Sequence, residues 1–300
     1  MSYRTLTLKW PAVGVAQVRL IRESEMNTLS LELLDELSRA VDAVMTAKGR
    51  VLVITGAGRA FCCGAHLKYF AGPDAIFTER FDTRDRYFER IARLFDKLEA
   101  IGIPVIAAIN GFALGGGFEL ALACDFRILT TTAKVGLPEA RFGATPGAGG
   151  VQKLARHIGR GKALEWILLG RHVPAAEAEA AGIAYRVVDP ERLDEASLEL
   201  ARELLKLSPQ ALGQCKASVH LAGDVDLRSA RRFGVEALSA LVGSPDWLEG
   251  MAAFVEKRAP RFEPPAPPRP PPWRPPRPPD PPPDPPGELL WLLAGASSWA

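Results

Sequence analysis

The chain has 300 residues, of which 47% are hydrophobic and 24% are charged, and its formal net charge is +2. This length allows a full hydrophobic core with a smaller appended region, and the balanced charge argues against a nucleic acid or an acidic membrane surface as partner. The four cysteines lack the spacing of a metal site, so we expect reduced thiols in a cytoplasmic protein. The N-terminus is strand-like, unlike a signal peptide, and no apolar run reaches about 18 residues, so no membrane span is expected.

The first two-thirds of the chain alternate between predicted strands and helices. Short apolar runs bounded by Gly, Pro or Asn predict strands at 5–8, 15–20, 51–55, 104–109, 126–129 and 184–188. Helical periodicity predicts helices at 31–48, 84–100, 150–157, 161–169 and 174–182. Ser30 is expected to cap the first helix. The helix 84–100 is expected to bury Phe88, Ile91, Phe95 and Leu98. This alternation is typical of an α/β fold.

The last third of the chain has a different character. Residues 193–257 are helical in pattern, with helix starts at Ser208-Pro209 and Ser244-Pro245. Beyond Phe262 the chain is rich in proline, interleaved with Arg and Asp, a composition that cannot form a packed core. We therefore expect a catalytic core at 1–192, a helical oligomerisation region at 193–262 and a disordered tail at 263–300.

The most informative stretch is residues 110–125, NGFALGGGFELALACD. It follows the buried strand 104–109 and changes, after three glycines, to a helix-compatible pattern. The glycines allow close approach of the backbone to a ligand, and the helix N-terminus offers free N–H groups and a partial positive charge. Glu119 lies in the first turn of this helix, so an N–H donor at Gly116 and a carboxylate are three residues apart.

Three other loops carry residues of the same chemistry. They are residues 64–68 (GAHLK), 136–139 (GLPE) and 146–150 (PGAGG). Backbone N–H groups of Ala65 and Gly116 could form an oxyanion hole for a developing enolate oxygen. Glu119 and Glu139 could share acid and base work on one water molecule.

Taken in order, these segments resemble the crotonase family, also called enoyl-CoA hydratase/isomerase. The resemblance runs from about Arg19 to Phe262 and includes residues 54–61 (ITGAGRAF), the GAxLK loop at 64–68, Asn110-Gly111 with the triple glycine, Leu137-Pro138-Glu139 and the PGAGG loop. It implies a spiral of ββα units with a C-terminal helical region. It also implies homotrimers or dimers of trimers, and an acyl-CoA thioester as substrate.

The same resemblance implies roles for individual residues. The N–H groups of Ala65 and Gly116 correspond to the oxyanion hole, and Glu119 and Glu139 to the two catalytic glutamates of hydratases, with Glu119 as the base that deprotonates water and Glu139 as the proton donor to C2. His66, Leu67 and Lys68, together with Ala65 and Gly116, are expected to contact the substrate. The implied reaction is hydration of a trans-2-enoyl-CoA, without a metal or cofactor beyond the coenzyme A of the substrate.

Some alternatives stay open at this point. An enoyl-CoA isomerase, or a specialised dehydratase acting on a carnitinyl-CoA-like substrate, would use the same oxyanion hole. Some relatives of the family bind AU-rich RNA, but helix 31–48 lacks the lysines that this would need. His66 stands where the family usually has Asp, and Thr145 where relatives often have an aliphatic residue, so both bear on substrate preference. Lys68 could pair with a phosphate of coenzyme A or remain solvated.

Overall fold

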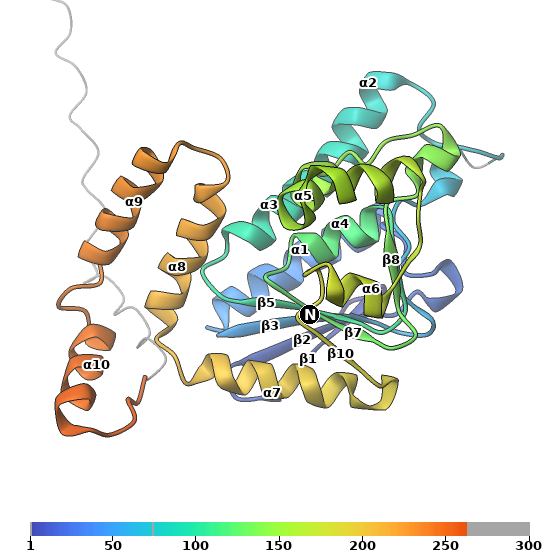
Figure 1. Cartoon of the computed structure of the whole chain (residues 1–300). Coiled ribbons are helices and arrows are strands. Elements are labelled where there is room, and N and C mark those ends of the chain that lie inside the picture. The colour runs from blue at the N-terminus through green and yellow to red at the C-terminus, as the bar shows by residue number, and fades with distance from the viewer. Residues whose placement is uncertain (1, 74, 263–300) are drawn as a thin grey trace, which may run out of the picture. The chain divides into compact units, whose positions relative to one another are not determined.

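The computed structural model describes residues 2–73 and 75–262 (Figure 1). The strands in chain order are β1 (Leu6–Ala12), β2 (Val15–Leu20), β3 (Val51–Gly56), β4 (Ala60–Cys62), β5 (Val105–Ile109), β6 (Phe112–Leu114), β7 (Phe126–Thr130), β8 (Lys134–Gly136), β9 (Val173–Pro174) and β10 (Arg186–Val188). The helices are α1 (Leu31–Thr46), α2 (Arg80–Thr83), α3 (Glu89–Ala100), α4 (Gly116–Leu122), α5 (Gly150–Leu168), α6 (Ala175–Ala180), α7 (Leu193–Leu205), α8 (Pro209–Ala222), α9 (Leu227–Ser239) and α10 (Pro245–Glu256). The expected α/β fold is confirmed.

The main sheet has six strands in the order β1-β2-β3-β5-β7-β10. Only the pairing of β1 with β2 is antiparallel; the other neighbours are parallel. Strand β3 is buried on both faces, which explains its unbroken apolar sequence. Val51 and Val53 pack with residues of α7, whereas Leu52 and Ile54 join the larger core on the opposite face. Helix α7 therefore covers one face of the sheet (Figure 1).

A second, smaller sheet has the strand order β4-β6-β8-β9. Strand β6 pairs in parallel with both β4 and β8, and β9 pairs with β8 in the antiparallel sense. Each of these strands is only two or three residues long. Such runs are too short to show a period in the sequence, which predicts no strand at β4 or β6. This sheet carries the candidate site.

Helix α1 begins as the sequence predicts, because the Ser30 hydroxyl accepts a hydrogen bond of 3.2 Å from the backbone N–H of Leu33. Residues 84–100 are helical as predicted, with a π-helical segment at Arg84–Phe88 before α3. The prediction that Phe88 is buried is wrong. Tyr87, four residues before Ile91 and so on the same helix face, is fully buried, whereas Phe88 is 43% exposed. Ile91, Phe95 and Leu98 are buried as expected.

The helical pattern from 150 to 169 is also interrupted as the sequence predicts. Gly159 has φ +77° and ψ +159°, which is not a helical conformation, so α5 is kinked between two helical parts. Glycine suits this position because a side chain would strain a backbone with positive φ.

The C-terminal helices are tied to the sheet by one buried cation. Lys216 of α8 lies 2.9 Å from a carboxylate oxygen of Asp125 and donates to the carbonyl oxygens of Leu98 and Ile103 at 2.8 and 3.1 Å. Helices α9 and α10 nevertheless expose several large apolar side chains, namely Leu227, Val235, Leu238, Leu248, Phe254 and Val255. The division of the chain into 1–192, 193–262 and 263–300 stays a prediction, and 263–300 lies outside the described residues.

Candidate active site

The candidate site lies where three neighbouring parallel strands end. Strand β4 leads to Ala65, β6 leads to Gly116, and β8 leads to Glu139. Because β4, β6 and β8 are adjacent and parallel, their carboxyl ends meet at one edge of the small sheet. The N–H of Gly115 donates to the carbonyl oxygen of Gly136 at 2.9 Å, which holds the second and third loops side by side.

The backbone amides of Ala65 and Gly116 come close together at this edge. A Cβ atom placed on Gly64 would lie 2.7 Å from the nitrogen of Gly116, and one placed on Gly116 would lie 3.7 Å from the nitrogen of Ala65. Gly64 also has φ +80°, so glycine is needed there for both conformation and space. Gly116 is the first residue of α4, where an N–H has no acceptor within the helix and the dipole adds positive charge. The pair can therefore bind one oxyanion.

Glu119 projects from the first turn of α4 and is only 4% exposed. Its Oε1 atom accepts hydrogen bonds from the backbone N–H groups of Ala148 (2.9 Å) and Gly150 (2.8 Å). Burial raises the pKa of Glu119, while these two hydrogen bonds and the charge of Lys153 act in the opposite direction. The two N–H donors thus support the ionised form of this carboxyl group.

Glu139 begins the 3₁₀ helix Glu139–Phe142 and is partly buried. Within the described part of the chain its Oε2 atom is buried without a hydrogen-bond partner. Its Oε1 atom lies beside Gly115, where an added Cβ would be 3.0 Å away. Burial, with a smaller contribution from the nearby charge of Glu119, raises the pKa of Glu139 to about 7 against the lowering effect of a hydrogen bond from its own backbone N–H.

The two carboxyl groups are close enough for the charge of Glu119 to raise the pKa of Glu139, yet their environments differ. Glu119 has two N–H donors, whereas Glu139 has an unpaired oxygen and the higher tendency to stay protonated. Such divergence is how one site provides an acid and a base at the same pH. Among residues 2–73 and 75–262 there is no group of three or more His, Cys, Asp or Glu side chains placed to hold a metal ion.

Comparisons with known proteins find relatives over most of the chain. The family model described as enoyl-CoA hydratase/isomerase matches residues 12–265. A protein from Rhizobium meliloti (strain 1021) named "Probable enoyl-CoA hydratase" is 38% identical over 264 residues, which are 88% of this chain and 99% of that protein. The "Crotonyl-CoA hydratase" of Syntrophomonas wolfei subsp. wolfei is 35% identical over 87% of this chain and 99% of its own length. The crystal structure of enoyl-CoA hydratase from Bacillus anthracis superposes with a TM-score of 0.80 at 38% identity, covering 86% of this chain and 99% of that one.

The chain belongs to the enoyl-CoA hydratase/isomerase family.

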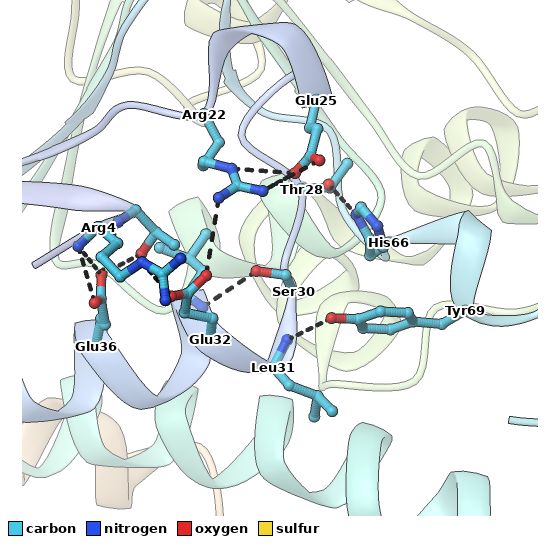
Figure 2. Close-up of polar contacts among 12 residues, drawn as sticks. Arg4, Arg22, Glu25, Thr28, Ser30, Leu31, Glu32, Glu36, His66 and Tyr69 are labelled. Atoms are coloured by element: carbon cyan, nitrogen blue, oxygen red, sulfur yellow. Dashed lines mark hydrogen bonds and ion pairs between the residues drawn. The ribbon is translucent and has the colours of Figure 1, made fainter. Parts of the chain in front are cut away.

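Within this enoyl-CoA hydratase/isomerase chain, the loop after Ala65 is held by its own side chains. The ring nitrogen Nδ1 of His66 is 2.8 Å from the hydroxyl of Thr28, and Figure 2 shows the two side chains turned toward each other. Burial lowers the pKa of His66, which favours the neutral ring. Leu67 and Lys68 are exposed on the following turn, and their expected contacts with the substrate stay predictions.

Two site features are not evident from the sequence. The first is the pair of N–H donors at Ala148 and Gly150, for which the glycine-rich loop at 146–150 was the available signal. The second is Tyr87, which lies on the same helix face as the buried Ile91 and Leu94, although the sequence prediction puts its neighbour Phe88 there. Thr145 is exposed, and its expected influence on the acyl pocket stays a prediction.

Proposed function

We propose that this chain is an enoyl-CoA hydratase, which adds water to a trans-2-enoyl-CoA to give a 3-hydroxyacyl-CoA. The family match and relatives named as hydratases support the reaction class, that of a hydro-lyase. The relative named as a crotonyl-CoA hydratase makes a short enoyl-CoA the first substrate to test.

In the proposed reaction the substrate thioester oxygen binds between the N–H groups of Ala65 and Gly116. Glu119 takes a proton from a water molecule whose oxygen attacks C3, and the electrons of the double bond move into the thioester to form an enolate. The two N–H groups stabilise the enolate oxygen. Glu139 gives its proton to C2, and the proton taken by Glu119 then restores Glu139. Both new bonds form on one face, so the addition is syn.

The observation that carries this proposal is the difference between the two carboxyl groups. A carboxylate held by the N–H groups of Ala148 and Gly150 suits a base that orients water, and a half-buried acid with pKa about 7 suits a proton donor. Proton transfer and hydrogen bonding by these groups complete the reaction, so it calls for no cofactor beyond the coenzyme A that the substrate carries.

The test is hydration of crotonyl-CoA, followed by loss of the enoyl absorbance, in the parent chain and in the variants Glu119→Gln and Glu139→Gln. Each variant is expected to lose about 10²–10⁴ in kcat while it still binds the thioester. Full activity in either variant would contradict the assignment. An isomerase would instead shift the double bond of a 3-enoyl-CoA and would tolerate Glu119→Gln.

We also propose that the active form is a homotrimer or a dimer of trimers. The apolar side chains exposed on α9 and α10 support a surface that another copy covers, because such patches are unusual on monomers. Light scattering on the purified chain tests this, and a monomer at micromolar concentration would contradict it.

Within the described residues no helix is long and apolar enough to cross a bilayer. The cytoplasmic location expected from the sequence stays a prediction.

A further inference from the structure

Tyr87 is a buried polar residue that the proposed reaction does not use. Its side chain is fully buried among Tyr69, Phe70 and Phe77, with ring centroids 5.4–5.6 Å from its own. It lies in the π-helical segment Arg84–Phe88. A phenylalanine would fill the same apolar space, so the packing does not account for the hydroxyl group.

The hydroxyl of Tyr87 joins two backbone groups on either side of the oxyanion loop. It donates to the carbonyl oxygen of Leu29 at 2.6 Å and accepts from the N–H of His66 at 2.8 Å. A hydroxyl has one proton to donate, so these two bonds fix its orientation. Burial raises the pKa of Tyr87, and the hydroxyl therefore keeps that proton over the working pH range.

A second contact from Leu29 fixes the other side of Ala65. The N–H of Leu29 donates to the carbonyl oxygen of Gly64 at 2.8 Å. In a planar trans peptide the carbonyl and the following N–H point in opposite directions, so this bond turns the N–H of Ala65 away from the Leu29 backbone. Residue 29 is thus bound to the residue before Ala65 directly and to the residue after it through Tyr87.

The hydroxyl also acts as a spacer. Leu29 and Ala65 are paired in parallel register, which directs the carbonyl of Leu29 toward the N–H of His66. Both groups now bond to the intervening hydroxyl. Without it they would be left unpaired in a buried place, or would close directly and draw Ala65 toward Leu29. Either outcome moves the N–H of Ala65 relative to that of Gly116.

We propose that Tyr87, supported by the Thr28 hydroxyl on His66, is a positioning residue that sets the distance and direction of the Ala65 N–H in the oxyanion hole. The inference rests on the proposed role of Ala65 in binding the thioester oxygen. It assigns to the Tyr87 hydroxyl a part in catalysis beyond packing, because that hydroxyl alone, among the described side chains of the cluster, bonds to the backbone next to Ala65.

The test compares the parent chain with Tyr87→Phe by two readouts. The first is hydration of crotonyl-CoA, for which kcat is expected to fall about tenfold to a hundredfold while KM changes less than about threefold. The second is the infrared carbonyl stretch of bound butyryl-CoA labelled with ¹³C at the thioester, a ligand that cannot be hydrated. Its shift from the free value reports hydrogen bonding to the oxygen and is expected to shrink in Tyr87→Phe. An unchanged kcat together with an unchanged stretch would overturn the proposal.

Tyr69→Phe is the matched control. It removes a hydroxyl from the same cluster, one that accepts from the N–H of Leu31 at the start of α1 at 3.2 Å (Figure 2). We expect kcat within about twofold of the parent and an unchanged stretch, since an exposed or helix-end hydrogen bond contributes only about 1 kcal/mol to stability. Equal effects of the two variants on both readouts would overturn the proposal, because they would indicate general disorder of the cluster.

Two further measurements keep the test decisive. If Tyr87→Phe does not fold, Thr28→Val removes the neighbouring bond to His66 and is expected to reduce the carbonyl shift in the same direction; no reduction would count against the proposal. If the parent chain does not hydrate crotonyl-CoA, the proposed function fails, and the butyryl-CoA measurement still tests the positioning of Ala65 by Tyr87.

Discussion

Replacement of Glu139 by Gln should make the protein less active and, at alkaline pH, more stable. Burial raises the pKa of Glu139 from 4.5 to about 7, so the folded chain binds this proton more tightly than the unfolded chain does. Between these two values the folded state holds more protons, and its stability therefore falls as pH rises from about 4.5 to about 7.

The magnitude follows from the size of the pKa change. A change from 4.5 to about 7 corresponds to about 3 kcal/mol of cost for the ionised form in the folded state above pH 7. Glu139 is only partly buried, so we discount this to about 1–2 kcal/mol for solvent screening. The amide of Gln does not ionise, so the folded variant does not carry the unfavourable free energy of a buried carboxylate at residue 139.

The measurement is chemical denaturation of the parent chain and of Glu139→Gln at about pH 5 and about pH 8. Relative to the parent, the variant should gain about 1–2 kcal/mol between the two pH values, which is about 2–6 °C in Tm for a domain of this size. Glu191→Gln, at an exposed carboxyl group, is the control and should show no such gain. A Glu139→Gln variant whose stability relative to the parent is the same at both pH values would refute the reasoning.

Two further substitutions test other parts of the structure. Gly150→Ala would place its Cβ 2.6 Å from Cγ of Glu119 and should lower kcat by about 10²-fold through displacement of that carboxylate, whereas Gly147→Ala in the same loop meets nothing within 4 Å and should retain activity. Equal crotonyl-CoA hydration in the two alanine variants would contradict this. Glu36 is 3% exposed, and burial acts to raise its pKa, but hydrogen bonds from the Thr5 hydroxyl and from the backbone N–H groups of Arg4 and Thr5, together with the charge of Arg39, outweigh burial so that the pKa is lowered. Glu36→Gln should therefore cost about 1–3 kcal/mol at pH 7, and urea titrations should show the loss shrinking below about pH 4.5; a loss independent of pH would contradict it.

The parts of the fold that the sequence predicts well are those with long or unambiguous local signals. Strand Val15–Leu20 is matched at both ends because it directly follows the turn signal of Pro11 and Gly14, and the Ser30 cap fixes the start of α1. The parts that it does not predict depend on contacts between distant segments. Strands β4 and β6 exist because each pairs with a neighbour, and three residues carry no period of their own.

The candidate site also has features that the sequence predicts and features that depend on contacts between distant segments. Residue type and spacing point to Glu119 and Glu139 as an acid–base pair, but only the family resemblance assigns the base to Glu119 and the proton donor to Glu139. The difference between their environments comes from the N–H groups of Ala148 and Gly150 on one carboxyl group and from the unpaired oxygen of the other. The error at Phe88 has another cause: both Tyr87 and Phe88 fit the helical spacing of the buried face, and only the packed structure shows that Tyr87 takes the buried position.

The three adjacent strand ends also have a consequence for how such a site could change over time. Each strand, β4, β6 or β8, delivers one group, and the backbone pairing that sets its position does not depend on the identity of the side chain delivered. A replacement at residue 139 would therefore alter the proton chemistry while leaving the carbonyl-binding amides in place. Under the proposed function, a variant changed only at residue 139 would still bind the thioester. A new reaction could then evolve from the existing one without passing through a variant that no longer binds the substrate.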